Sequence, residues 1–204
     1  MASTIHQRMR PRRTKTACLA LVVGAALGLA GCTGSSGGDE PSTKASTAAP
    51  APHTTASQTK TTAVDAGNAA LDASPGATVI SVERESAGTQ WEVEAVHDGT
   101  VQIIRVSASD ASVTSGPTTK NEDSQDIAEH TSQVKKAKID FARAAAIIRK
   151  QVANGTITEL NLDDRRGSVV WEADVIDTSG TKHEIAVDAV DGTVVANGTE
   201  SSGG

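Results

Sequence analysis

Aromatic side chains and cysteines are scarce in this chain of 204 residues. The sequence has one Phe, no Tyr, two Trp and two Cys. Because large aromatic side chains are so few, Trp91 and Trp171 each represent a large share of the material available for a hydrophobic core. Cys18 and Cys32 both lie near the N-terminus, so internal disulfides are excluded as the means of holding the rest of the chain together.

Positive charge is also sparse once the first 31 residues are set aside. The formal net charge is −6, and residues 1–31 contribute five basic side chains and no acid. Without those five charges the net charge becomes −11. Because binding to DNA or RNA depends on positive charge that neutralises phosphates, we expect no nucleic-acid partner.

Motifs that would indicate catalysis or metal binding are missing. His97, His130 and His183 do not follow one another at helical spacing, and the sequence has neither an HExxH motif nor a cysteine pair for zinc. No G-x-S-x-G nucleophile motif occurs either. We therefore predict no catalytic, cofactor-binding or metal-binding residues, and a protein that is not an enzyme.

Residues 1–31 have the pattern of an export signal. A basic stretch is followed by an apolar run over residues 17–30, and fourteen residues are fewer than the ~20 that a transmembrane helix needs. The pattern therefore predicts a signal peptide rather than a membrane span. A twin-arginine signal at Arg12-Arg13 is an alternative export route.

The apolar run ends in Leu29-Ala30-Gly31-Cys32, which resembles the lipobox of bacterial lipoproteins at all four positions. The resemblance implies cleavage before Cys32 and attachment of two acyl chains (palmitate or similar) to its thiol through a thioether. Two acyl chains are enough for stable anchoring, so we expect a protein held on the extracytoplasmic side of the cell membrane. The alternative is an ordinary secretory signal with a chance cysteine.

Residues 32–63 are dominated by Ser, Thr, Ala, Gly and Pro. Such a composition offers too little apolar surface to offset the entropy of folding. We expect a disordered tether here, in which the isolated His53 is a solvated side chain rather than a ligand.

Residues 64–114 predict one helix followed by three or four strands. Asp65 is a candidate N-cap, and Gly67 weakens a thin helical face of alanines. In the strand that follows, Trp91 and its alternate neighbours point one way while Glu92 and Glu94 point the other. Asp98-Gly99 is a strong hairpin signal.

Residues 139–200 repeat this order with a better helix. Asp140 is the candidate N-cap, Asn154-Gly155 the predicted end, and one apolar stripe is formed by Phe141, Ala144, Ala145, Ile148 and Val152. The strand around Trp171 again alternates with acids, which are Glu172 and Asp174. Two units of similar length indicate a duplicated element. They are separated by residues 115–138, which we predict to be a linker, the alternative being a weak helix supported by Ile127, Ala128 and Val134.

The closing segment Val187-Asp188-Ala189-Val190-Asp191-Gly192-Thr193-Val194, together with the helix and the aromatic-Glu strand, resembles the PepSY repeat. Residues 107–113 of the first unit lack the corresponding first Asp and the Gly. The resemblance implies an α+β fold of two repeats, each one helix packed on a three- to four-stranded antiparallel sheet. It leaves open whether the two sheets are continuous.

The two tryptophans have two interpretations, core packing and ligand stacking, of which the shared apolar face favours core packing. The four acids opposite them, Glu92, Glu94, Glu172 and Asp174, are the candidate partner-binding face. A solvated sheet face is the default interpretation. A face that meets a basic protein partner is the functional one.

PepSY domains occur in peptidase propeptides and in envelope proteins, for which inhibition or regulation of peptidases has been proposed. The family pattern contains no catalytic residues to carry over. The resemblance therefore implies a non-catalytic binding or regulatory module that modulates or inhibits a secreted peptidase. The alternative is a structural cell-envelope protein that binds wall components.

Overall fold

The computed structural model describes residues 60–199. They form a mixed α+β fold of three α-helices, one 3-10 turn and eight strands. The elements are α1 (Ala63–Ala73), β1 (Thr78–Glu85), η1 (Ser86–Gly88), β2 (Gln90–His97), β3 (Thr100–Ser107), β4 (Val113–Thr119), α2 (Ser124–Lys136), α3 (Phe141–Ile148), β5 (Thr156–Arg165), β6 (Ser168–Ile176), β7 (Lys182–Asp188) and β8 (Val194–Thr199).

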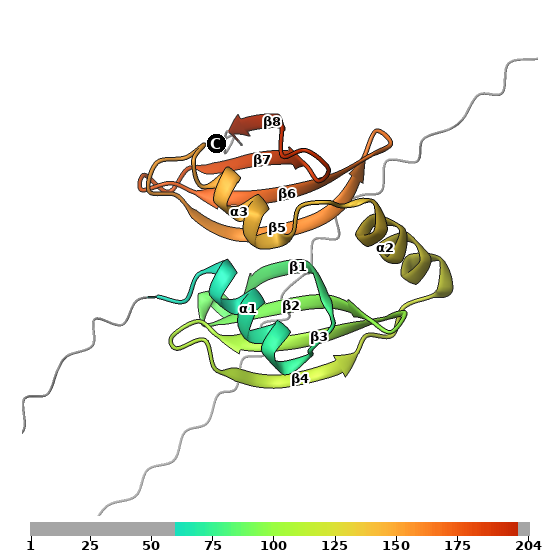
Figure 1. Cartoon of the computed structure of the whole chain (residues 1–204). Coiled ribbons are helices and arrows are strands. Elements are labelled where there is room, and N and C mark those ends of the chain that lie inside the picture. Colours follow the sequence, from blue (N-terminus) through green and yellow to red (C-terminus); the bar gives the residue numbers. More distant parts are fainter. Residues whose placement is uncertain (1–59, 200–204) are drawn as a thin grey trace, which may run out of the picture. The chain divides into compact units, whose positions relative to one another are not determined.

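All eight strands belong to one antiparallel sheet, in the order β4-β3-β2-β1-β5-β6-β7-β8 (Figure 1). The sheet is therefore larger than the three- to four-stranded sheets that the sequence predicts. Strands β1 and β5 join its two halves through three residue pairs, Ser81–Asn161, Val82–Leu160 and Glu83–Glu159. We call this β1–β5 junction the seam.

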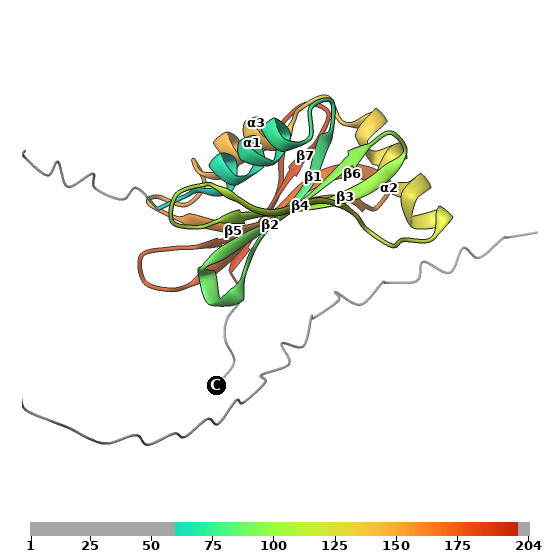
Figure 2. The ribbon, with the colours of Figure 1, turned by 90° about the horizontal axis from the view of Figure 1, so that it is seen from below.

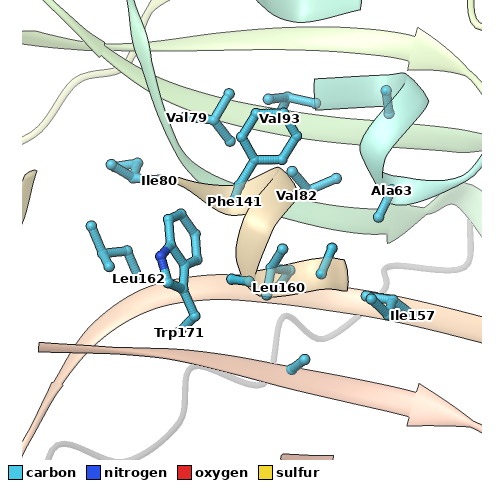
Figure 3. Close-up of a cluster of buried hydrophobic side chains, with 14 of the residues drawn as sticks. Ala63, Val79, Ile80, Val82, Val93, Phe141, Ile157, Leu160, Leu162 and Trp171 are labelled. Atoms are coloured by element: carbon cyan, nitrogen blue, oxygen red, sulfur yellow. The ribbon is translucent and has the colours of Figure 1, made fainter. Parts of the chain in front are cut away.

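Helices α1 and α3 lie side by side on one face of the sheet and contact each other (Figure 2). Under them runs a row of buried apolar side chains, one from each of six neighbouring strands: Ile104, Val93, Val82, Leu160, Ala173 and Ile185. Figure 3 shows the part of this core around Phe141 and Trp171. The core thus crosses the seam without interruption.

Both tryptophans lie in this core, which confirms the packing interpretation. Trp91 and Trp171 are 0% and 1% exposed. The indole Nε1 of Trp171 donates a hydrogen bond to the carbonyl oxygen of Ile139 over 3.0 Å. The Nε1 of Trp91 has no acceptor among the described residues, and the guanidinium of Arg84 lies 5.3 Å from the centre of its ring.

The apolar stripe predicted for α3 is confirmed, since all five of its residues are buried. Asp140 is the N-cap, as predicted, and accepts a hydrogen bond from the backbone N–H of Arg143. The helix ends at Ile148, earlier than Asn154-Gly155, because the backbone N–H groups of Lys150 and Gln151 bond three residues back and tighten the chain into turns.

Helix α1 begins differently from the prediction. Thr62 is its N-cap, and Asp65 is the third helical residue of a capping box in which each side chain accepts from the other's backbone N–H. Packing explains why residue 67 is a glycine, because a Cβ at this position would overlap the Phe141 ring of α3. The residue that weakens α1 in isolation lets α1 and α3 approach each other.

The segment predicted as a linker, residues 115–138, contains most of β4 and the helix α2. Asp123 caps α2 by accepting from the backbone N–H groups of Gln125 and Asp126. The helix packs on β1, β2 and β5. Its Gln133 is buried, and its Val134 packs against the core. The structure therefore shows the alternative, a helix over this segment, in place of a linker.

The two edge strands of the sheet differ in composition. Strand β4 is exposed along its whole length, pairs with β3 with two register shifts, and contains Pro117. Strand β8 contains neither proline nor a charged residue, and its Val195 is 50% exposed.

Candidate functional site

The face of the sheet opposite α1 and α3 carries the four acids predicted to meet a partner, and we call it the acidic face. Glu92 and Glu94 lie on β2, and Glu172 and Asp174 lie on β6. Each alternates with a buried residue of the core, and the register across the seam places both pairs on the same side. The structure thus brings the four residues onto one face.

These four carboxylates are less exposed than a solvated face would leave them. Their side chains are 10%, 13%, 29% and 16% exposed in sequence order. Each of them is paired with a cation. The pairs are Glu92 with Arg105 (2.6 Å), Glu94 with Lys120 (2.7 Å), Glu172 with Arg165 (3.1 Å) and Asp174 with Lys182 (2.9 Å).

Sequence reasoning missed these four cations, although one signal for the first was available. The Asp98-Gly99 turn fixes the register of the β2–β3 hairpin, in which Glu92 lies directly opposite Arg105. On β7, Glu184 lies directly opposite Asp174, and Lys182 comes two residues before Glu184. Lys120 follows β4, and no local pattern predicts its contact with Glu94.

A row of carboxylates runs across the acidic face in register. One acid comes from each of five neighbouring strands: Glu92 (β2), Glu83 (β1), Glu159 (β5), Asp174 (β6) and Glu184 (β7). Neighbouring strands are about 4.8 Å apart, so the row places like charges close together along its whole length. We call it the carboxylate row.

Glu159 is the central member of the carboxylate row. Burial, followed by the negative charges of Asp174 and Glu83, raises the pKa of Glu159, and a hydrogen bond with Asp174 acts in the same direction. The side-chain amide of Asn161 donates to Glu159 and opposes the rise. Glu159 therefore holds its proton more tightly than an ordinary glutamate.

A second polar cluster connects the acidic face to α2. The Lys120 ammonium lies 2.7 Å from Glu94 and 2.8 Å from Glu122. Burial lowers the pKa of Lys120, but hydrogen bonds to Glu122 and Glu94 outweigh it, and the net effect is a raised pKa. His130 of α2 lies 3.7 Å from Glu122, so the cluster holds α2 against the sheet.

The three described histidines lie in separate places. His97 is near Asp98, His130 near Glu122, and His183 bonds Asp177 over 2.9 Å. Hydrogen bonds from His183, then from Ser179 and the backbone N–H of Thr181, lower the pKa of Asp177. The backbone N–H of Ser179 also donates to Asp177, which is the geometry of an Asx-turn.

Residues 60–199 bring together no group of three or more His, Cys, Asp or Glu that could hold a metal ion. None of their helices is both long and apolar enough to cross a bilayer.

Several predictions concern residues outside the described range. These are the signal peptide at 1–31, lipidation of Cys32, nearly all of the tether at 32–63, and the solvated His53. They stay predictions.

Comparison with known proteins bears on the second half of the sheet. Residues 138–197 match the PepSY family model. The family is described as "Peptidase propeptide and YPEB domain". The PepSY match begins just before the Asp140 cap of α3 and includes β5, β6, β7 and most of β8. It thus contains both Glu172 and Asp174 of the acidic face.

Three solved structures are similar to this chain. A candidate lipoprotein of Clostridium difficile 630 (CD1622) is 24% identical, with 69% of this chain and 94% of that chain covered and a TM-score of 0.43. The YpmB protein of Bacillus subtilis is 20% identical (66% and 95%, TM-score 0.29). The C-terminal domain of Bacillus megaterium YpeB is 14% identical (68% and 65%, TM-score 0.26). No curated protein matches the chain.

Proposed function

We propose that this protein is a non-catalytic binding module, anchored by lipid outside the cytoplasm, that restrains or modulates a secreted peptidase. The observation that carries the proposal is the match of residues 138–197 to a family described by peptidase propeptides. A propeptide acts by binding its peptidase, so its function needs a surface and no catalytic group. The acidic face is the surface that we assign to this role.

In this proposal residues 64–114 form a second PepSY-like unit. Irregularities in β1 and β5 support the correspondence, because the register shifts between Val79 and Ser81 and again between Ile157 and Glu159. The residues that precede α1 and α3 are also held by equivalent backbone hydrogen bonds. The backbone N–H of Thr61 donates to Ala108 O, and that of Ile139 donates to Ala189 O.

This correspondence gives the seam a local twofold relation. Val82 and Leu160 are equivalent residues and pair directly with each other. On either side, Ser81 pairs with Asn161 and Glu83 pairs with Glu159, so each unit contributes the same three positions. The two units would then present their acids on one continuous face.

Lipid anchoring has a direct test. We expect Cys32→Ala to move the protein from the membrane fraction to the soluble extracytoplasmic fraction, because no thiol would remain at the lipobox position to carry acyl chains. Cell fractionation with immunoblotting measures this, and Cys18→Ala is the matched control that keeps the anchor. Undiminished membrane retention of Cys32→Ala would refute lipidation.

The peptidase proposal is tested by capture and by activity. We expect the full chain, purified in non-ionic detergent, to retain an exported peptidase from envelope extracts and to lower its activity. Reversing two charges of the acidic face (Glu94→Lys with Glu172→Lys) should slow association at least about tenfold, because opposite charges steer encounter. Asp72→Lys, an exposed change on α1, is the control.

Two results would count against the proposal. Capture of no peptidase and no effect on exported peptidase activity would remove its basis. Sedimentation with purified peptidoglycan, unaffected by the charge reversals, would instead support the structural wall-binding alternative.

A further inference from the structure

The seam is the shortest junction in the sheet, and the carboxylate row crosses it. Strands β1 and β5 pair over three residues each, whereas β5 and β6 pair along nearly their whole lengths. At one of the three seam positions, Glu83 lies directly opposite Glu159. Two carboxylates therefore face each other where the two halves of the sheet are joined.

Cations hold the outer members of the carboxylate row. Arg105 lies 2.6 Å from Glu92, and Lys182 lies 2.9 Å from Asp174 and 3.9 Å from Glu184. Glu159, in the middle, has acids as its neighbours on both sides. Like charges directly opposite each other on neighbouring strands destabilise a sheet.

Hydrogen bonds link Glu159 to the seam itself. The hydroxyl of Ser81 on β1 donates to the side-chain oxygen of Asn161 on β5, over 2.7 Å. The amide nitrogen of Asn161 then donates to Glu159. This chain of hydrogen bonds spans both strands. Because the Asn161 donor favours the ionised carboxylate, it opposes the effect of burial, Asp174 and Glu83, which together outweigh it and leave the pKa of Glu159 raised.

We propose that the seam is a proton-sensitive joint: a proton held between Glu159 and Asp174 keeps β1 and β5 together, and its loss loosens them. With that proton present, the Glu159–Asp174 contact is a hydrogen bond and one negative charge is removed beside Glu83. With it absent, three neighbouring carboxylates are ionised across three strands. The inference does not depend on the proposed peptidase role.

The direction of the pH effect follows from the pKa of Glu159. This pKa is raised above the ordinary 4.5 by burial and by Asp174 and Glu83. Between the ordinary and the raised value, the joined state binds more protons than the open state. The contribution to stability is therefore complete below pH 4.5 and is lost as the pH rises through the raised pKa.

The charged groups around Glu159 come from the elements packed on β5. Glu83 of β1 and Asp174 of β6 face it directly, with Lys182 of β7 on the far side of Asp174. Helices α1 and α3 lie on the opposite face (Figure 2). Helix α2 also packs on β5 and carries Asp126, Glu129, His130, Lys135 and Lys136.

Native-state hydrogen exchange of the full chain in non-ionic detergent tests the proposal. We expect protection factors of seam amides in β1 and β5 to fall between pH 5 and pH 7.5, by about tenfold for each unit by which the pKa of Glu159 exceeds 5. Amides between β6 and β7 serve as the internal reference, and their protection should change less than about twofold.

Variants identify the group responsible. Glu159→Gln should make seam protection equal at both pH values, because glutamine has no proton to lose and gains no negative charge as the pH rises. Glu83→Gln should shrink the fall, and Asp163→Asn, an exposed acid on the same strand, should leave it unchanged. An undiminished fall in both Glu159→Gln and Glu83→Gln, or no fall in the wild type, would overturn the proposal.

Discussion

Replacing Trp171 with alanine is expected to lower the free energy of unfolding by about 3–5 kcal/mol. Trp171 is 1% exposed and is one of only two tryptophans in a core otherwise made mostly of Val, Ile and Ala. Small neighbours cannot refill the space that an indole leaves. Its hydrogen bond to Ile139 is lost as well. Urea unfolding followed by circular dichroism measures the change, since tryptophan fluorescence would change with the substitution itself.

The two tryptophans provide a matched comparison for the hydrogen bond alone. Phenylalanine preserves most of the buried volume but has no donor. Trp171→Phe should therefore destabilise by about 1 kcal/mol more than Trp91→Phe, because only the Trp171 indole has an acceptor among the described residues. Equal losses would show that the Ile139 contact adds nothing measurable.

Replacing Gly67 with alanine is expected to destabilise the protein by about 1–3 kcal/mol. In an isolated helix the same change would be favourable by up to ~1 kcal/mol, so the sign tests the packing. A Cβ on Gly67 would lie 2.7 Å from Cζ and 2.9 Å from Cδ2 of Phe141. The ring is buried under α1 and α3 and has little room to move. Thermal unfolding by circular dichroism reports the difference.

Two controls separate overpacking from other effects of a glycine change. Gly198→Ala adds a Cβ that meets nothing within 4 Å and should change stability by less than about 0.5 kcal/mol. In a Phe141→Leu background, Gly67→Ala should lower the free energy of unfolding by less, because the new Cβ meets a smaller side chain. An unchanged cost in that background would locate the strain elsewhere in α1.

Much of the fold could be predicted because strand and helix periods report which side a residue faces. Trp91 and Trp171 were placed on the buried side by alternation along one strand, and both are buried. The stripe of α3 was likewise fixed by its own spacing, and Asp140 by its position before that stripe. These inferences use contacts that lie within one element or one hairpin.

The features that escaped prediction depend on residues far apart in sequence. Nothing in β1 or β5 alone indicates that Val82 pairs with Leu160. The sequence therefore does not show whether the two units share one continuous sheet. Helix α2 has too few apolar side chains for its own sequence to favour a helix over a linker, and the contact of Val134 with the core forms only in the folded protein. The candidate acidic face was predicted in position. Its partly covered, ion-paired state was not, since Lys120 and Glu94 meet only in the folded sheet.

The unequal edges of the sheet bear on how copies of this chain could associate with one another. Growth of a fibre from sheets requires two edges that accept a further strand. Pro117 removes one backbone donor from β4, whereas β8 has no such block. Pairing of β8 with β8 of another copy would be isologous and would use up both open edges at once. Association through β8 would therefore favour a pair of copies, because β4, with Pro117 and two register shifts, is the poorer edge for a further strand.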